Sequence, residues 1–132
     1  MEMKSNGAFR LTYFTEKYDQ TIAFYKDKLE LEVLHVWDRH ENDKGTLLKA
    51  GVGTIEVLLT PIDDYKVKGL DYRKPQGVFA CLQVDSASEL YEKYKKKNIE
   101  FKEDLVDQSW GHRSFSVVDP NGVVLFLFEE LF

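Results

Sequence analysis

The stretch WGHRSFSVVDPNGVVLFLF, residues 110–128, decides the fold of this chain. It contains an alternating polar and apolar run at 113–118 and a continuous apolar run at 123–128. Alternation is typical of a strand with one buried face, and a continuous apolar run is typical of a strand covered on both faces. The tetrapeptide DPNG at 119–122 separates the runs, and its proline and glycine suit a tight turn. The pattern predicts a β-hairpin.

The composition is that of a single globular domain. The chain has 132 residues, 43% of them hydrophobic and 31% charged, which is enough to bury a core. No run approaches the roughly eighteen apolar residues of a membrane span, and MEMK at 1–4 does not begin an apolar signal region, so we expect a cytoplasmic protein without a cleaved signal or a membrane partner. The single Cys81 agrees with a reducing compartment. The net charge of −5 argues against a nucleic-acid partner.

The first part of the chain predicts the order β-α-β-β-β. Ile22, Tyr25 and Leu29 recur at helical spacing, which gives the expected helix one apolar face. The expected elements are a strand at 9–15, a helix from an Asp19 cap to about Leu29, a strand at 32–38, a polar loop at 40–45, and strands at 46–50 and 54–59 joined by a tight connection at 51–53.

A second β-α-β-β-β order follows a charged connector at 61–76. We therefore expect one domain, residues 1–132, made of two repeated modules at about 9–60 and 77–130. Ser86 and Glu89 are spaced as a capping box, and the lysines at 95–97 place positive charge at the C-terminal end of that helix. The expected elements are a strand at 78–84, a helix with Ala87, Leu90, Tyr91 and Tyr94 on its apolar face, and strands at 101–106, 113–118 and 123–128.

The hairpin and the repeat together resemble the vicinal oxygen chelate superfamily, which includes glyoxalases, bleomycin-resistance proteins and ring-cleaving dioxygenases. The closing hairpin of that family runs W-G-x-R-x-F-x-x-x-D-P-x-G-N, and this chain matches every letter except the last, where Val123 stands. FYKDKLEL at 24–31 is similar to the family's F-Y-x-x-x-L-G, with Glu30 in place of glycine. The resemblance implies an α+β fold in which two βαβββ modules form curled mixed sheets around a cleft, commonly in a homodimer.

Strand alternation sorts the side chains by face, because successive residues of a strand point to opposite sides. Val78, Ala80, Leu82 and Val84 are all apolar and should face the helices. The mixed rows should then face the cleft: Arg10, Thr12 and Phe14 on the first strand, Phe79, Cys81 and Gln83 on the fifth, and Glu56, Leu58, Val124, Phe126 and Phe128 on the strands beside them.

Metal-dependent members of this superfamily carry His or Glu at four inward positions, which correspond here to Arg10, Glu56, Phe79 and Phe126. Arginine stays protonated and phenylalanine has no donor atom, so three of the four cannot bind a metal ion. One carboxylate is too few, since zinc and similar ions take about three or four protein ligands. We expect no metal cofactor, and a divalent metal held by other ligands is the alternative.

The other inward residues predict a surface that recognises a small molecule. Arg10 and Glu56 either contact a ligand or form a structural salt bridge. Arg113 pairs with a ligand acid, with Asp119 or with a backbone carbonyl, and His112 lies at the cleft mouth or on the surface. The aromatic residues either pack in the core or form pocket walls. The candidate ligand-binding residues are Arg10, Thr12, Phe14, Trp37, Glu56, Phe79, Cys81, Trp110, Arg113 and Phe126.

Two functions follow from these residues. The first is a metal-independent binding protein of the bleomycin-resistance type, which holds a small, partly aromatic or cationic, antibiotic-like molecule. The second is an enzyme, either a glyoxalase-type lyase, isomerase or dioxygenase with a divergent metal site, or an acid/base isomerase with Glu56 as the catalytic residue. A dimeric scaffold without either activity is a third possibility. The missing metal donors favour binding, although fold alone does not determine function.

Overall fold

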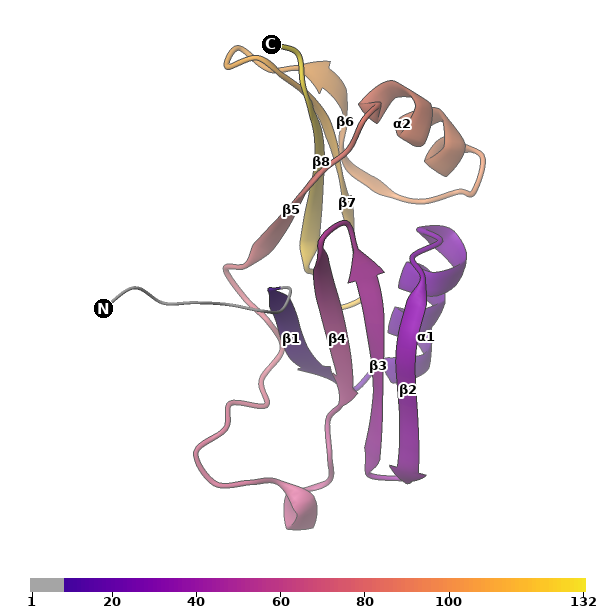
Figure 1. Cartoon of the computed structure of the whole chain (residues 1–132). Coiled ribbons are helices and arrows are strands. Elements are labelled where there is room, and N and C mark those ends of the chain that lie inside the picture. Colours follow the sequence, from indigo (N-terminus) through magenta and orange to yellow (C-terminus); the bar gives the residue numbers. More distant parts are fainter. Residues whose placement is uncertain (1–8) are drawn as a thin grey trace, which may run out of the picture.

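Two four-stranded mixed sheets form the framework of the computed structural model, which describes residues 9–132 (Figure 1). Sheet A contains β1 (Arg10–Thr15), β2 (Val33–His40), β3 (Asp43–Ala50) and β4 (Gly53–Leu59), and sheet B contains β5 (Phe79–Gln83), β6 (Phe101–Asp107), β7 (His112–Val118) and β8 (Val124–Glu130). Their strand orders are β1-β4-β3-β2 and β5-β8-β7-β6, with β1–β4 and β5–β8 parallel and the other pairs antiparallel. The expected fold of two βαβββ modules is confirmed.

The helix of the first module differs in detail from the prediction. It consists of α1 (Tyr18–Ala23) and a π-helical turn, η1 (Phe24–Lys28). The predicted Asp19 cap is wrong, because Lys17 occupies the N-cap and provides no side-chain hydrogen bond. Asp19 lies in the first turn instead, where its negative charge interacts favourably with the positive end of the helix dipole.

The second helix begins as the sequence predicts. It is α2 (Ala87–Lys95), and the Ser86 hydroxyl accepts the backbone N–H of Glu89 at 3.2 Å. Its C-terminal end carries lysines, and the Lys97 ammonium donates to the backbone carbonyl of Asp27 in the first module. The helix end therefore also contacts the neighbouring module.

The polar loop predicted at 40–45 is wrong. β2 continues to His40 and β3 begins at Asp43, so only two residues form the turn. The strands remain paired there, with Asp38 opposite Lys44 and His40 opposite Asp43. An exposed strand pair tolerates polar side chains on both faces, and a polar run therefore does not distinguish it from a loop.

Within residues 9–132, each sheet has one face packed against a helix and one face that no helix covers, which we call its open face (Figure 1). On β8, Leu125 and Leu127 are buried in the core, whereas Phe126 and Phe128 are half-buried on the open face of sheet B. The prediction that this strand is covered on both faces is therefore wrong within the chain. On β5, Ala80 and Leu82 face the core as predicted, while Val78 precedes the strand and is exposed.

The DPNG turn joins the two modules. The Gly122 N–H donates to the Asp119 carbonyl at 3.1 Å, and Gly122 has a φ of 87°, as the tight turn requires. Asn121 accepts from the Thr15 hydroxyl at 2.5 Å and donates to the Thr21 hydroxyl at 2.9 Å. Residues predicted only as a hairpin turn therefore also form a buried polar contact with the first module.

The connector between the sheets contains one short 3-10 helix, η2 (Asp63–Tyr65), and runs along the β1 side of sheet A (Figure 1). The ring of Tyr72 packs on Phe14 with ring centroids 4.4 Å apart. Among the helices in residues 9–132, none has the length and apolar character needed to cross a membrane.

Candidate functional site

The open face of sheet A carries a carboxylate with two side-chain partners. The parallel register of β1 and β4 places Thr12 beside Glu56. The Arg10 guanidinium donates from Nη1 to Oε2 of Glu56 at 3.0 Å, and the Thr12 hydroxyl donates to Oε1 at 3.1 Å. The Glu56 side chain is 16% exposed and that of Arg10 is 49% exposed. The two predicted residues thus form an ion pair, and it lies on an open sheet face, not in the core.

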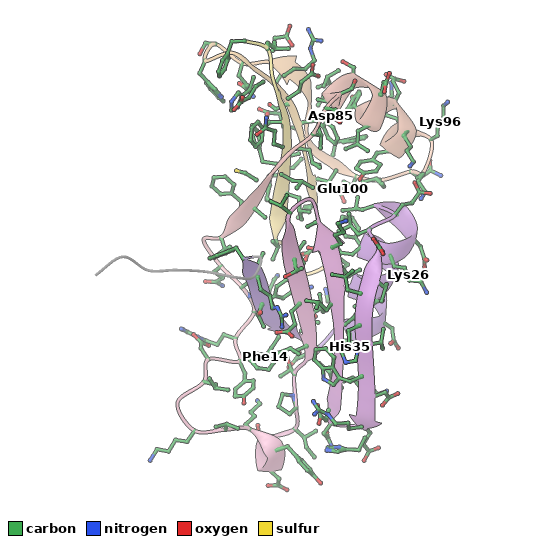
Figure 2. The ribbon with its side chains drawn as sticks, in the orientation of Figure 1. Phe14, Lys26, His35, Asp85, Lys96 and Glu100 are labelled. Atoms are coloured by element: carbon green, nitrogen blue, oxygen red, sulfur yellow. The ribbon has the colours of Figure 1, made fainter. Side chains whose placement is uncertain are left out.

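Two predicted aromatic residues share this face. Trp37 lies opposite Gly45 on β3, which in turn lies opposite Leu58 on β4. Phe14 follows Thr12 by two residues on β1 and lies beside the connector (Figure 2). The structure therefore brings together five of the predicted residues: Arg10, Thr12, Phe14, Trp37 and Glu56.

A pocket of about 440 Å³ opens on this face. Phe14, Trp37 and Glu56 line it from the sheet, and Tyr65 and Pro61 line it from the connector. The rings of His40 and Tyr65, which also line the pocket, lie 5.3 Å apart. Apolar rings next to a paired carboxylate provide both contact area and a point of hydrogen bonding for a small ligand.

A larger pocket of about 670 Å³ lies at the free edge of β1. It is lined by residues of β1, by connector residues and by Val123, and it shares Thr12 and Phe14 with the predicted site. Hydrogen bonds from Arg73 lower the pKa of Asp71 on its rim to about 2. That ion pair is exposed, so salt and water screen it strongly. We place the candidate site on the open face because Glu56 lies there.

Three other predicted residues lie on the open face of sheet B. Cys81 is opposite Phe126 in the β5–β8 register, and Phe79 is opposite Val124. Phe79 is 65% exposed, and Phe126 stacks with Phe128 at a ring distance of 6.1 Å. Partial burial raises the pKa of the Cys81 thiol, so the thiol is not activated as a nucleophile. This face is mainly an aromatic wall.

The last two predicted residues lie away from the Glu56 face. Trp110 is exposed in the turn before β7. Arg113 shares the helix-covered side of β7 with Phe115 and binds Asp107, from Nε at 2.7 Å and Nη2 at 3.2 Å. These hydrogen bonds lower the pKa of Asp107. The protein partner of Arg113 is thus Asp107 and not Asp119.

His112 occupies the open face of sheet B. Its ring stacks on Phe128 at 4.5 Å and is nearly parallel to the ring of Phe132. Its Nδ1 atom is buried and has no hydrogen-bond partner within residues 9–132. The imidazole therefore belongs to the aromatic wall of sheet B.

The residues at the family's four metal positions do not fit a metal ion. The register places Arg10, Glu56, Phe79 and Phe126 on open faces, as predicted from strand alternation. Only Glu56 has oxygen donors, and each of its oxygens already accepts a hydrogen bond. No group of three or more His, Cys, Asp or Glu side chains in residues 9–132 is arranged to hold a metal ion.

Sequence reasoning did not include His40 and Tyr65, which line the pocket, or Gly45, which lies under the Trp37 ring. The region around Gly45 and His40 was expected to be a loop, so neither residue was placed beside Trp37 or the connector. No local sequence pattern predicts that Tyr65 lines the pocket, because its position depends on how the connector folds back. The only local signal for the positions of His40 and Gly45 was that two residues are enough to connect a pair of neighbouring strands.

Comparison with known proteins identifies the family and the fold. The profile of the Glyoxalase/Bleomycin resistance protein/Dioxygenase superfamily matches residues 8–127. No match to the chain occurs among the curated proteins.

The chain is similar to TioX from Micromonospora sp. ML1, at 16% identity over 96% of this chain and 100% of that chain, with a TM-score of 0.76. It is similar to a lactoylglutathione lyase from Agrobacterium tumefaciens, at 16% identity over 96% of each chain and a TM-score of 0.71. A superfamily member from Sphaerobacter thermophilus DSM 20745 is 22% identical over 93% of this chain and 96% of that chain, with a TM-score of 0.69. At such identities these structures support the shared fold alone. With its profile match over most of the sequence, the chain belongs to the Glyoxalase/Bleomycin resistance protein/Dioxygenase superfamily.

Proposed function

We propose that this protein binds a small, partly aromatic, antibiotic-like molecule on the open face of sheet A without a metal ion. The observation that carries the proposal is the position of Glu56. Its carboxylate is held by Arg10 and Thr12 at the wall of a pocket of about 440 Å³ that also contains Trp37. Aromatic area with a few fixed polar groups is the usual composition of a small-molecule site.

The proposal includes a homodimer in which a second copy completes the site. Among the described residues, those that line the pocket on sheet A belong to the first module and the connector. The aromatic wall of sheet B leaves Phe79 65% exposed and Phe126 half-buried. An exposed apolar surface of this kind favours association. Pairing the open face of sheet A with the open face of the partner's sheet B covers both and encloses a ligand between the pocket of one copy and the aromatic wall of the other.

Catalysis by Glu56 is less well supported than binding. Acid/base catalysis needs a group that takes up a proton and groups that pass it on during the reaction. Both Glu56 oxygens accept hydrogen bonds, and neither donor can relay a proton, because the Arg10 guanidinium stays protonated and Thr12 is a neutral hydroxyl. The arrangement suits a fixed recognition group better than a proton carrier.

A melting-temperature screen tests the proposal. Glycopeptide drugs, thiol adducts and catechols are added to the metal-free protein, and compounds that raise the melting temperature are titrated by calorimetry. We expect Glu56→Gln to weaken binding because Arg10 and Thr12 then lose a charged acceptor. Glu100→Gln, an exposed change in the second module (Figure 2), is the matched control and leaves binding unchanged. Equal affinity of both variants for every compound would contradict a site at Glu56.

A further inference from the structure

The indole ring of Trp37 lies directly on the backbone of Gly45. A Cβ atom at position 45 would lie 2.0 Å from Cζ2 and 2.3 Å from Cε2 of the indole, closer than any real side-chain contact. Gly45 itself is buried beneath the ring. It does not have the positive φ that favours glycine, so the backbone alone does not require a glycine here. The missing side chain provides space for the ring.

The flat position of Trp37 gives the pocket an aromatic wall. One face of the indole covers Gly45, and the residue is half-buried and lines the pocket together with Glu56 and Tyr65. Along the same strand, His35 lies 5.6 Å and Arg39 6.0 Å from the Trp37 ring. These two residues flank the indole along β2, and Gly45 lies beneath it. An aromatic face fixed in this way is suited to stacking on another planar ring.

We propose that Gly45 is a positioning residue for the ligand: it lets Trp37 lie flat across β3, so that the indole stacks on a planar aromatic part of the bound molecule. The Arg10–Glu56 pair then receives a polar substituent that has both a hydrogen-bond donor and an acceptor, such as an amide. This inference rests on the proposed function and adds to it the class of ligand and the residue that shapes the site.

Two probes of the same size separate stacking from general apolar contact. Naphthalene-2-carboxamide presents a planar aromatic ring system and an amide, and decahydronaphthalene-2-carboxamide presents the same skeleton in saturated form. We expect the wild-type protein to bind the aromatic probe more tightly than the saturated one. Trp37→Ala removes this preference and weakens binding of the aromatic probe about fivefold or more, as expected for the loss of one aromatic pair.

A double-mutant cycle tests the role of Gly45. Gly45→Ala should weaken binding of the aromatic probe about as much as Trp37→Ala does. The double variant should show no further loss of affinity, because Gly45 acts only through the indole ring of Trp37. Gly53→Ala is the matched control, since its added methyl group approaches only backbone oxygens and lies away from the indole. Its affinity for the aromatic probe should equal that of the wild type.

Fluorescence provides a readout that does not depend on the ligand. In a Trp110→Phe background Trp37 is the only tryptophan, and Gly45→Ala should make it more accessible to acrylamide. If Gly45→Ala fails to fold while the double variant with Trp37→Ala folds, the clash with the indole is established. Absence of any preference of the wild type for the aromatic probe would overturn the inference, as would additive losses in the double variant. A compound that needs Glu56 but neither Gly45 nor Trp37 would overturn it and leave the proposed function standing.

Discussion

The hydroxyl of Tyr13 donates a hydrogen bond of 2.5 Å to the carboxylate of Asp119, and this contact joins the first strand of one module to the closing hairpin of the other. Tyr25 donates to the same oxygen at 2.8 Å, and the backbone N–H groups of Asn121 and Val123 donate to the second oxygen. Asp119 is 4% exposed. Four donors compensate the buried carboxylate, so the turn both reverses the chain and fastens the modules together.

Replacing Asp119 with Asn tests this contact. The amide keeps the size of the side chain but removes the charge and places an N–H₂ group among four donors, so at least one of them loses its acceptor. We expect the free energy of unfolding to fall by about 2–3 kcal/mol, the cost of an unsatisfied buried group in a network. Urea unfolding measures it. Asp64→Asn, on an exposed turn of the connector, is the control, and a loss equal to that of the control would contradict the role of Asp119.

Buried tyrosines predict a loss of stability at alkaline pH. Burial raises the pKa of Tyr94 to about 12 and also raises the pKa values of Tyr13 and Tyr25 above that of an exposed tyrosine. Between pH 10 and 12 the unfolded chain therefore releases the Tyr94 proton while the folded chain keeps it. The contribution of the buried, neutral Tyr94 to stability is complete below pH 10 and is lost as the pH rises through this range.

Tyr94→Phe isolates this effect. At neutral pH the variant should be less stable by about 1 kcal/mol, because it lacks the hydrogen bond from the Tyr94 hydroxyl to the carbonyl of Leu29. Between pH 10 and 12 the wild type should lose roughly 2–3 kcal/mol more than the variant. Urea unfolding across this range measures both, and the exposed Tyr65→Phe serves as control. Parallel pH curves for the wild type and Tyr94→Phe would contradict the assignment.

Phe79 tests the proposed homodimer. It is 65% exposed in the single chain, so Phe79→Glu should not disturb the fold, but it places a charge in the proposed contact between copies. We expect the wild type to sediment as a dimer and Phe79→Glu as a monomer with unchanged circular dichroism. Val52→Glu, at a turn position that is 97% exposed, is the matched control and should remain dimeric. A monomeric wild type, or a dimeric Phe79→Glu, would contradict the shared cleft.

Strand alternation was sufficient to predict which residues reach the open faces. The side-chain period of two is a local property, and it correctly placed Arg10, Glu56 and Phe126 on the uncovered faces. Strand alternation did not predict whether anything packs against those open faces. The apolar row of Phe126 and Phe128 suggested a strand covered on both sides, yet the single chain leaves this row half-buried.

Contacts between distant residues were beyond the sequence pattern. Asp119 and Tyr13 are 106 residues apart, and nothing in the turn motif indicates a hydroxyl partner. The position of Trp37 on Gly45 depends on the register of β2 and β3, which the polar turn region concealed. The site was therefore predictable strand by strand, whereas its shape depends on pairing that only the folded chain defines.

Calorimetric titration of a binding compound, carried out before and after treatment of the protein with a chelator, tests the metal-independent site most directly. The same samples are analysed for zinc, nickel, manganese and iron after dialysis against each ion. We predict well below one metal ion per chain and an affinity that the chelator does not change, because Arg10, Phe79 and Phe126 offer no ligand atoms. One tightly bound ion per chain, with binding lost on its removal, would contradict this account.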